Sequence, residues 1–113
     1  MSMDSLEMTG ADRRIILENC KSAPENNIII THGTDTMVKT AELLAREIKN
    51  KTIVFTGALV PYEFKNSDSL FNLGAAFAFV QTLPVGVYIA MNGKCFQWDK
   101  VKKNMENGFF DEI

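Results

Sequence analysis

The sequence predicts an α/β fold, a three-layer sandwich in which helices cover both faces of a mainly parallel sheet. Three short runs, at residues 28–30, 52–55 and 85–91, have the near-continuous apolarity of strands that are covered on both faces. Segments with a helical period precede the first run and separate it from the others. This alternation is typical of right-handed crossover units and a parallel sheet. Because such folds usually begin with a strand, and this chain begins with a polar hook and a helix, we expect the sheet to be incomplete at its N-terminal edge.

The first predicted helix begins at Thr9, which can cap it. Asp12 stands three positions later, where it completes an acidic variant of the capping box. Pro24 ends the helix, because proline cannot continue the hydrogen-bond ladder. The expected apolar face consists of Ile15, Ile16 and Cys20.

Two further helices follow the first and second strands. One starts after Thr36 and ends before residues 50–51, and its apolar stripe consists of Met37, Ala41, Leu44 and Ile48. A loop at 61–66 precedes the other, which Ser67 or Asp68 can cap and Pro84 ends. Its expected buried face consists of Leu70, Leu73, Phe77 and Val80. The last strand stops at the turn dipeptide Asn92-Gly93, and a shorter polar segment follows, with no element predicted in the tail.

Composition limits the classes of function. The chain has 113 residues, 46% of them hydrophobic, and a net charge of −2, which suits one domain over residues 1–113. With a pI of about 5.3 and scattered basic residues, it lacks the footprint of a nucleic-acid partner. Cys20 and Cys95 lack metal-binding or redox spacing, so we expect buried, reduced thiols and no metal. Without an apolar run long enough for a membrane span, or a signal-like N-terminus, we expect no membrane partner and a cytoplasmic location.

Small polar residues and glycines follow each predicted strand. They are Thr31-His32-Gly33-Thr34-Asp35, Thr56-Gly57-Ala58 and Met91-Asn92-Gly93. In open parallel sheets, ligands bind beyond the carboxyl ends of the strands, and glycine lets the backbone approach a ligand closely. The pattern therefore predicts a small-molecule site at this edge. On local sequence alone, helix capping explains the threonines and the aspartate equally well.

Several of these motifs resemble those of one enzyme family. Residues 30–37 are similar to the second signature of the L-asparaginase/glutaminase amidohydrolases, and Thr56-Gly57-Ala58 is similar to their TGA segment. Residues 67–73 and 86–104 resemble the helix start and the lysine-bearing segment that follow, and Asp4-Ser5 resembles the substrate-contacting hook. The chain is similar to the small single-domain asparaginase-like proteins of that family. The family's first signature, a TGGTI-like strand and turn with a catalytic threonine, does not occur in these residues.

The resemblance implies a flavodoxin-like asparaginase N-terminal domain, truncated at the front, that hydrolyses the side-chain amide of a small amino acid such as L-asparagine without a cofactor. It implies a catalytic triad of Thr34, Asp35 and Lys103, in which a neutral lysine amine accepts a proton from the threonine hydroxyl or from a water bound to it. Substrate contacts are implied for Ser5, Asp35 and the Ala58 backbone. Since the first signature is missing, we expect little or no turnover by this short chain.

Each of these residues also has a simpler interpretation. Lys103 belongs to a lysine-rich cluster and could be solvated, Asp35 could only cap the following helix, and Ser5 could be a turn residue. We interpret His32, the only histidine, as a structural hydrogen-bonding residue and not as a general base, because the family pattern gives it no catalytic part.

An alternative function is a catalytically silent, truncated α/β module that keeps the binding edge. An incomplete sheet would leave residues 28–30 as an unpaired edge strand, and such edges favour strand addition or dimerisation. On either interpretation we expect a homo-oligomer.

Overall fold

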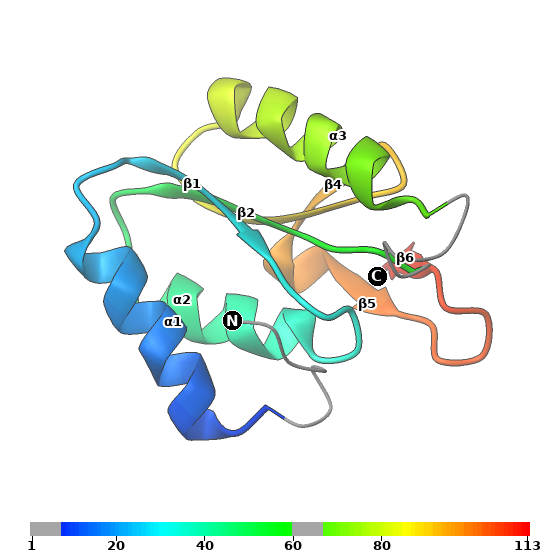
Figure 1. Cartoon of the computed structure of the whole chain (residues 1–113), viewed down its shortest axis with the longest axis horizontal. Helices are drawn as coiled ribbons and strands as arrows, with labels where there is room; N and C mark the ends of the chain where they lie inside the picture. The colour runs from blue at the N-terminus through cyan, green and yellow to red at the C-terminus, as the bar shows by residue number, and fades with distance from the viewer. Residues whose placement is uncertain (1–7, 60–66) are drawn as a thin grey trace.

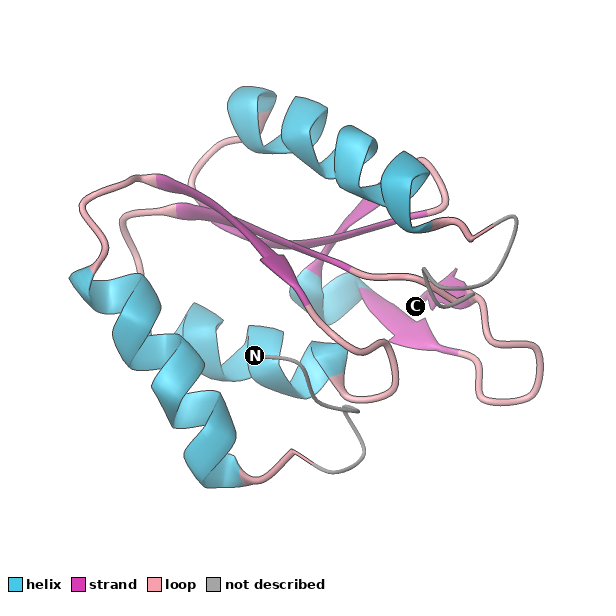
Figure 2. Ribbon diagram, in the orientation of Figure 1, coloured by secondary structure: helices cyan, strands magenta, loops and turns pink. Residues whose placement is uncertain are grey.

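A central sheet separates two helical layers in the computed structural model, which describes residues 8–59 and 67–113 (Figure 1). The sheet runs in the order β1 (Asn27–Thr31), β2 (Thr52–Thr56), β3 (Gly86–Met91) and β4 (Lys94–Gln97). The first three strands are parallel, and β4 is antiparallel to β3. Figure 2 shows α1 (Gly10–Ser22) and α2 (Met37–Glu47) on one face of the sheet and α3 (Ser69–Thr82) on the other. The predicted mainly parallel three-layer sandwich is confirmed.

The helix ends follow from local sequence. Thr9 Oγ1 accepts a hydrogen bond from the Asp12 backbone N–H at 3.2 Å, and Asp12 Oδ2 accepts one from the Thr9 N–H at 2.9 Å. This reciprocal pair is the predicted capping box. Thr36 and Asp68 are the N-cap residues of α2 and α3, and α3 ends at Thr82, two residues before the proline.

Apolar side chains fill both interfaces between the sheet and the helices. On the α1 and α2 side the buried set includes Leu17, Cys20, Met37, Ala41, Leu44, Ile48, Ile53, Phe55, Val87, Ile89 and Met91. On the α3 side it consists of Val54, Ala76, Val80, Tyr88 and Ala90. Successive side chains of a strand alternate between the two sets, as expected for a sheet covered on both faces. The predicted stripe of α2 is confirmed, since all four of its residues are buried.

Two predicted helix faces are partly wrong. In α1, Ile15 is 52% exposed, whereas Leu17 is fully buried. In α3, Leu70 and Phe77 are exposed, and the sheet is instead contacted by a face that includes Asn72, Ala76 and Val80. Almost every position of α3 is apolar or small, so its period does not define a face, and the hydrogen bonds of Asn72 determine which side turns inward.

The C-terminal segment adds elements that the sequence did not predict. Asn92 and Gly93 have φ angles of 56° and 77°, which form the tight turn of the β3–β4 hairpin. A 3₁₀ turn, η2 (Trp98–Lys100), leads into β5 (Val101–Lys103), which pairs antiparallel with β6 (Phe110–Glu112). This small ribbon lies near the carboxyl end of β2 in Figure 1. It brings the end of β5 to the predicted site.

The strand β1 is the outer strand of the sheet on the side opposite β4. It bonds to β2 on one side, where the Thr52 N–H donates to the Asn26 carbonyl and the His32 N–H donates to the Thr56 carbonyl. Within the described ranges, no strand pairs with its other side, and its three isoleucines are only partly buried. The edge predicted at residues 28–30 is therefore present. None of the described helices is long and apolar enough to cross a bilayer.

Candidate active site

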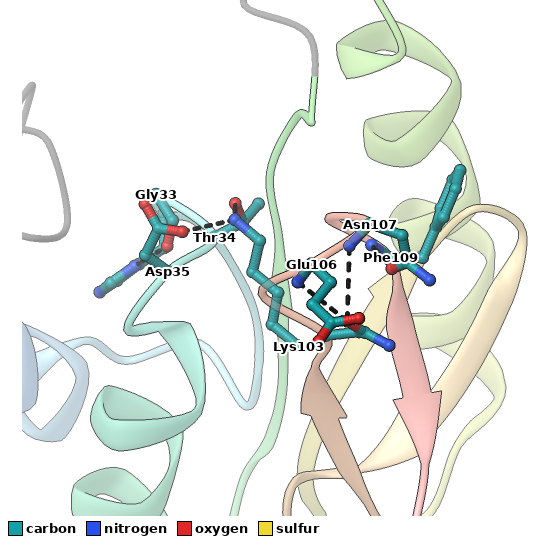
Figure 3. Close-up of polar contacts among 9 residues, drawn as sticks. Gly33, Thr34, Asp35, Lys103, Glu106, Asn107 and Phe109 are labelled. Carbon is teal, nitrogen blue, oxygen red and sulfur yellow. Dashed lines mark hydrogen bonds and ion pairs between the residues drawn. The ribbon is translucent and has the colours of Figure 1, made fainter.

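Three side chains that are distant in sequence meet at the carboxyl edge of the sheet. Thr34 and Asp35 lie in the β1–α2 turn (residues 32–36), and Lys103 ends β5. The Lys103 Nζ donates to Thr34 Oγ1 at 2.8 Å and to Asp35 Oδ1 at 2.5 Å (Figure 3). The structure thus brings the three predicted triad residues into direct contact.

This cluster is largely shielded from solvent. Thr34 is 9% exposed, and the side chains of Lys103 and Asp35 are 15% and 25% exposed. Partial burial strengthens the attraction between the ammonium and the carboxylate relative to a surface pair. Since the lysine amine also reaches the threonine hydroxyl, a proton moving between these two groups has a direct path. The solvated-lysine interpretation of Lys103 is therefore wrong.

The end of β2 is packed closely against the same turn. A Cβ atom added to Gly57 would lie 2.3 Å from the His32 carbonyl oxygen and 3.3 Å from Thr34 Cγ2. Only glycine permits this approach. Ala58 follows directly and is partly buried, so its backbone lies at the edge where Thr34 is located. Ser5, the other predicted substrate contact, lies outside the described residues.

Asn72 ties three loops of this edge together. It is fully buried, and its Nδ2 donates to the Gly57 carbonyl and to Asp68 Oδ2, each at 2.9 Å. Its Oδ1 accepts the Asn92 N–H at 3.0 Å. The ends of β2 and β3 and the start of α3 are thereby held in one arrangement. Sequence reasoning missed this role, although an amide in the first half of a mostly apolar helix was an available signal.

His32 is buried beside the cluster and is hydrogen-bonded through both ring nitrogens. Nδ1 lies 2.6 Å from the Gly33 carbonyl oxygen, and Nε2 lies 2.8 Å from Thr40 Oγ1. Burial lowers the pKa of His32 below its ordinary value of 6.5, and the charge of Arg13 acts in the same direction, against the hydrogen bond to Gly33. The hydrogen bonds expected of a structural histidine are therefore present.

The position of Lys103 depends on the β5–β6 connection. The Asn104 N–H donates to the Phe109 carbonyl at 2.7 Å, and Asn104 Oδ1 accepts the Glu106 N–H at 2.9 Å. Asn104 Nδ2 also donates to Asp111 Oδ2 at 3.1 Å. These bonds close the connection and hold the end of β5 where the lysine can reach the β1–α2 turn. The turn dipeptide Asn107-Gly108 in this connection, where Gly108 has a φ of 80°, was an available signal.

Neither cysteine is part of the cluster. Both thiols are free, and Cys20 is buried while Cys95 is partly buried, so the prediction of two buried thiols holds only for the first. Burial raises the pKa of Cys95 to about 11 and also raises that of Cys20, so both are neutral thiols at pH 7. Over residues 8–59 and 67–113, no group of three or more His, Cys, Asp or Glu side chains is placed to hold a metal ion.

Comparison with known proteins identifies the family. Residues 1–110 match the model of the asparaginase N-terminal domain. The chain belongs to the asparaginase family. It is 31% identical to L-asparaginase 1 of Escherichia coli over 112 residues, which cover 95% of this chain and 33% of that enzyme.

Solved structures of the family agree with this fold. The thermostable L-asparaginase from Thermococcus kodakarensis superposes with a TM-score of 0.89 at 30% identity, over 100% of this chain and 36% of that one. A probable cytoplasmic L-asparaginase from Campylobacter jejuni superposes with a TM-score of 0.79 at 32% identity, over 90% of this chain and 34% of that one. The present asparaginase-family chain thus spans about a third of the length of these relatives.

Proposed function

We propose that the edge occupied by Thr34, Asp35 and Lys103 is an amidohydrolase site for the side-chain amide of a small amino acid such as L-asparagine. The observation that carries this proposal is the contact of one amine with both a hydroxyl at 2.8 Å and a carboxylate at 2.5 Å. Membership of the asparaginase family supports it. A hydroxyl alone is a weak nucleophile, and a base within hydrogen-bond distance is what activates it.

In this proposal the three side chains have different tasks. Lys103, as a neutral amine, takes the proton from the Thr34 hydroxyl or from a water bound to it, so the Thr34–Lys103 hydrogen bond must reverse from the direction described above. Asp35 orients the amine and binds the α-amino group of the substrate. The Ala58 backbone contacts the side-chain amide, and Ser5 contacts the substrate carboxylate. The attacking oxygen forms a bond to the amide carbon, the C–N bond breaks, and ammonia leaves with a proton returned by the amine. When the attacking oxygen is that of Thr34, a water then hydrolyses the ester formed and restores the hydroxyl.

We also propose that residues 1–113 represent one asparaginase N-terminal-type domain with little or no turnover by itself. The family's first catalytic threonine motif is not among these residues. Two free, neutral thiols are consistent with a cytoplasmic location.

The second candidate function is a catalytically silent module that binds the amino acid or associates with copies of itself. The open side of β1 favours it, because unpaired backbone groups of an edge strand can pair with another chain. We propose a homo-oligomer on this ground, which sedimentation or light scattering of the purified chain would test.

Ammonia release from L-asparagine, together with calorimetric binding of the same compound, separates the two candidates. The measurement compares the chain with Thr34→Ala and Lys103→Met, using Lys102→Met as a control on the exposed side of β5. Release that exceeds the uncatalysed rate, is kept by the control and is lost in both other variants supports the hydrolase. Binding without release, the result that we expect for residues 1–113 by themselves, supports the silent module for this chain and keeps the proposed binding edge. Release that both variants retain, or the absence of both binding and release, contradicts the proposed site.

A further inference from the structure

A chain of hydrogen bonds leads from α1 to the backbone of the β1–α2 turn. Arg13 Nε donates to Thr40 Oγ1 at 3.1 Å, and the same hydroxyl lies 2.8 Å from His32 Nε2. On the other side of the ring, Nδ1 lies 2.6 Å from the Gly33 carbonyl oxygen. Arg13 and Thr40 are 27 residues apart, and they join α1, α2 and the turn.

The direction of each hydrogen bond follows from which groups can donate and which can accept. A guanidinium has only donors, so the Thr40 oxygen accepts from Arg13. The threonine hydroxyl then has its one hydrogen left to donate, and His32 Nε2 accepts it. A neutral imidazole carries its single proton on the other nitrogen, which faces a carbonyl oxygen that can only accept. All the bonds are satisfied by one ring tautomer, with the proton on Nδ1.

We propose that Arg13 and Thr40 hold His32 in its Nδ1–H tautomer, and that the ring thereby fixes the Gly33 carbonyl and positions Thr34 and Asp35 for Lys103. The three residues of this chain are positioning residues, and none of them contacts the substrate in this account. The inference deepens the proposed function and depends on it only for the importance of Thr34 and Asp35.

The ring can orient Thr34 through the backbone. The Gly33 carbonyl belongs to the planar peptide unit that joins Gly33 to Thr34, so holding its oxygen sets the orientation of that whole unit. Gly33 has no Cβ, and its backbone would otherwise sample more conformations than any other residue there. The close approach of Gly57 also confines the His32 carbonyl, one peptide unit earlier. Two successive peptide units are therefore held immediately before Thr34.

The same guanidinium reaches the start of the described chain. Arg13 Nη1 donates to the Met8 carbonyl at 3.4 Å, a longer bond than the one from Nε. One cation thus contacts both the residue before the capped start of α1 and the chain of bonds to the turn. A histidine that merely filled the core would not require this directional support.

The test is an NMR measurement that needs no catalysis. Because His32 is the only histidine, a long-range ¹H–¹⁵N spectrum of the uniformly ¹⁵N-labelled chain reports one imidazole without assignment. We expect a protonated Nδ1 and an unprotonated Nε2 at pH 7. A ring protonated on Nε2, or on both nitrogens, would overturn the proposal.

Variants then test the positioning. Thr40→Val keeps the shape of the side chain and removes the hydroxyl, and we expect about a tenfold change in the ratio of the two tautomers. The backbone amide signals of Thr34 and Asp35 should move with it, and Thr40→Ser should restore them. Lys39→Met, at an exposed position of α2, is the control and should leave them unchanged.

Arg13→Met provides an independent check if Thr40→Val folds poorly. It leaves the hydroxyl free to rotate and accept, so the Nε2–H form should gain population relative to the wild type, although the Gly33 carbonyl still favours a proton on Nδ1. Tautomer ratios and Thr34 amide signals that stay the same in every folded variant would refute the positioning role. Since no amide substrate is present, such a result is distinguishable from a failure of the proposed hydrolase.

Discussion

Removal of the Lys103 amine should destabilise the fold more than removal of the amine of Lys102, the preceding residue on β5. In Lys103→Met, the Asp35 carboxylate keeps its place but loses a partner at 2.5 Å. Broken buried pairs cost about 3–5 kcal/mol, and exposed pairs contribute about 0–1 kcal/mol. With side chains that are 15% and 25% exposed, this pair lies between those limits. We expect a loss of about 2 kcal/mol in the free energy of unfolding.

Urea unfolding at pH 7 can measure this loss, with the fluorescence of Trp98, the only tryptophan, as the probe. Lys102→Met is the matched control, because Lys102 is the exposed neighbour on β5 and should change stability by less than about 0.5 kcal/mol. A double-mutant cycle with Asp35→Asn should give a coupling of about 1–2 kcal/mol. Equal losses in the two lysine variants, or a coupling below about 0.3 kcal/mol, would show that the Lys103–Asp35 contact is not formed in solution.

Three further predictions concern the packing around the site. Gly57→Ala should lower the free energy of unfolding by about 2 kcal/mol, because its Cβ meets a backbone oxygen at 2.3 Å. Gly74→Ala, with open space around it on α3, should raise that free energy by about 0.5–1 kcal/mol. Urea midpoints check both, and equal effects would contradict the close approach. The lowered pKa of His32 means that the unfolded chain binds the extra proton, so stability from this group is complete above pH 6.5 and is lost as the pH falls below it. The stability difference between the wild type and His32→Gln should therefore shrink from pH 7 to pH 5, and a constant difference would contradict the burial of a neutral ring. Asn72→Leu should lower the free energy of unfolding by about 3 kcal/mol, because it leaves buried polar groups unpaired. Gln81→Leu, on the exposed side of α3, should change that free energy by less than about 0.5 kcal/mol. Similar urea midpoints for the two variants would disprove the role of the buried amide.

The elements predicted from sequence were those whose pattern is local. The strands β1, β2 and β3 are short apolar runs bounded by turn residues, and the stripe of α2 has a clear helical period. The face of α3 was misassigned because its composition is nearly uniform, and a tertiary contact of Asn72 decides its orientation. The strands β5 and β6 are short and carry little apolar pattern, so they were not predicted, although Asn107-Gly108 marks a turn in the six-residue connection between them.

The site divides in the same way. The place of Thr34 and Asp35 after a buried strand, where ligands of parallel sheets bind, marked them as candidates, but helix capping explained them equally well until the family resemblance was considered. Lys103 stands in a lysine-rich segment that by itself indicates a solvated surface, and only the family resemblance singled it out. The bonds that link Arg13, Thr40 and His32 join residues far apart in sequence, so their geometry emerges only when α1 and α2 pack together.

The most direct test of the central claim, that an amino-acid amide binds where Thr34, Asp35 and Lys103 meet, is a titration of the ¹⁵N-labelled chain with L-asparagine followed by amide NMR shifts. We predict that the largest shifts occur at Thr34, Asp35 and Ala58. They should be weaker in Asp35→Asn, and weaker again for succinamate, which lacks the α-amino group. Shifts centred away from this edge, or equal shifts with succinamate, would contradict the assignment of the site.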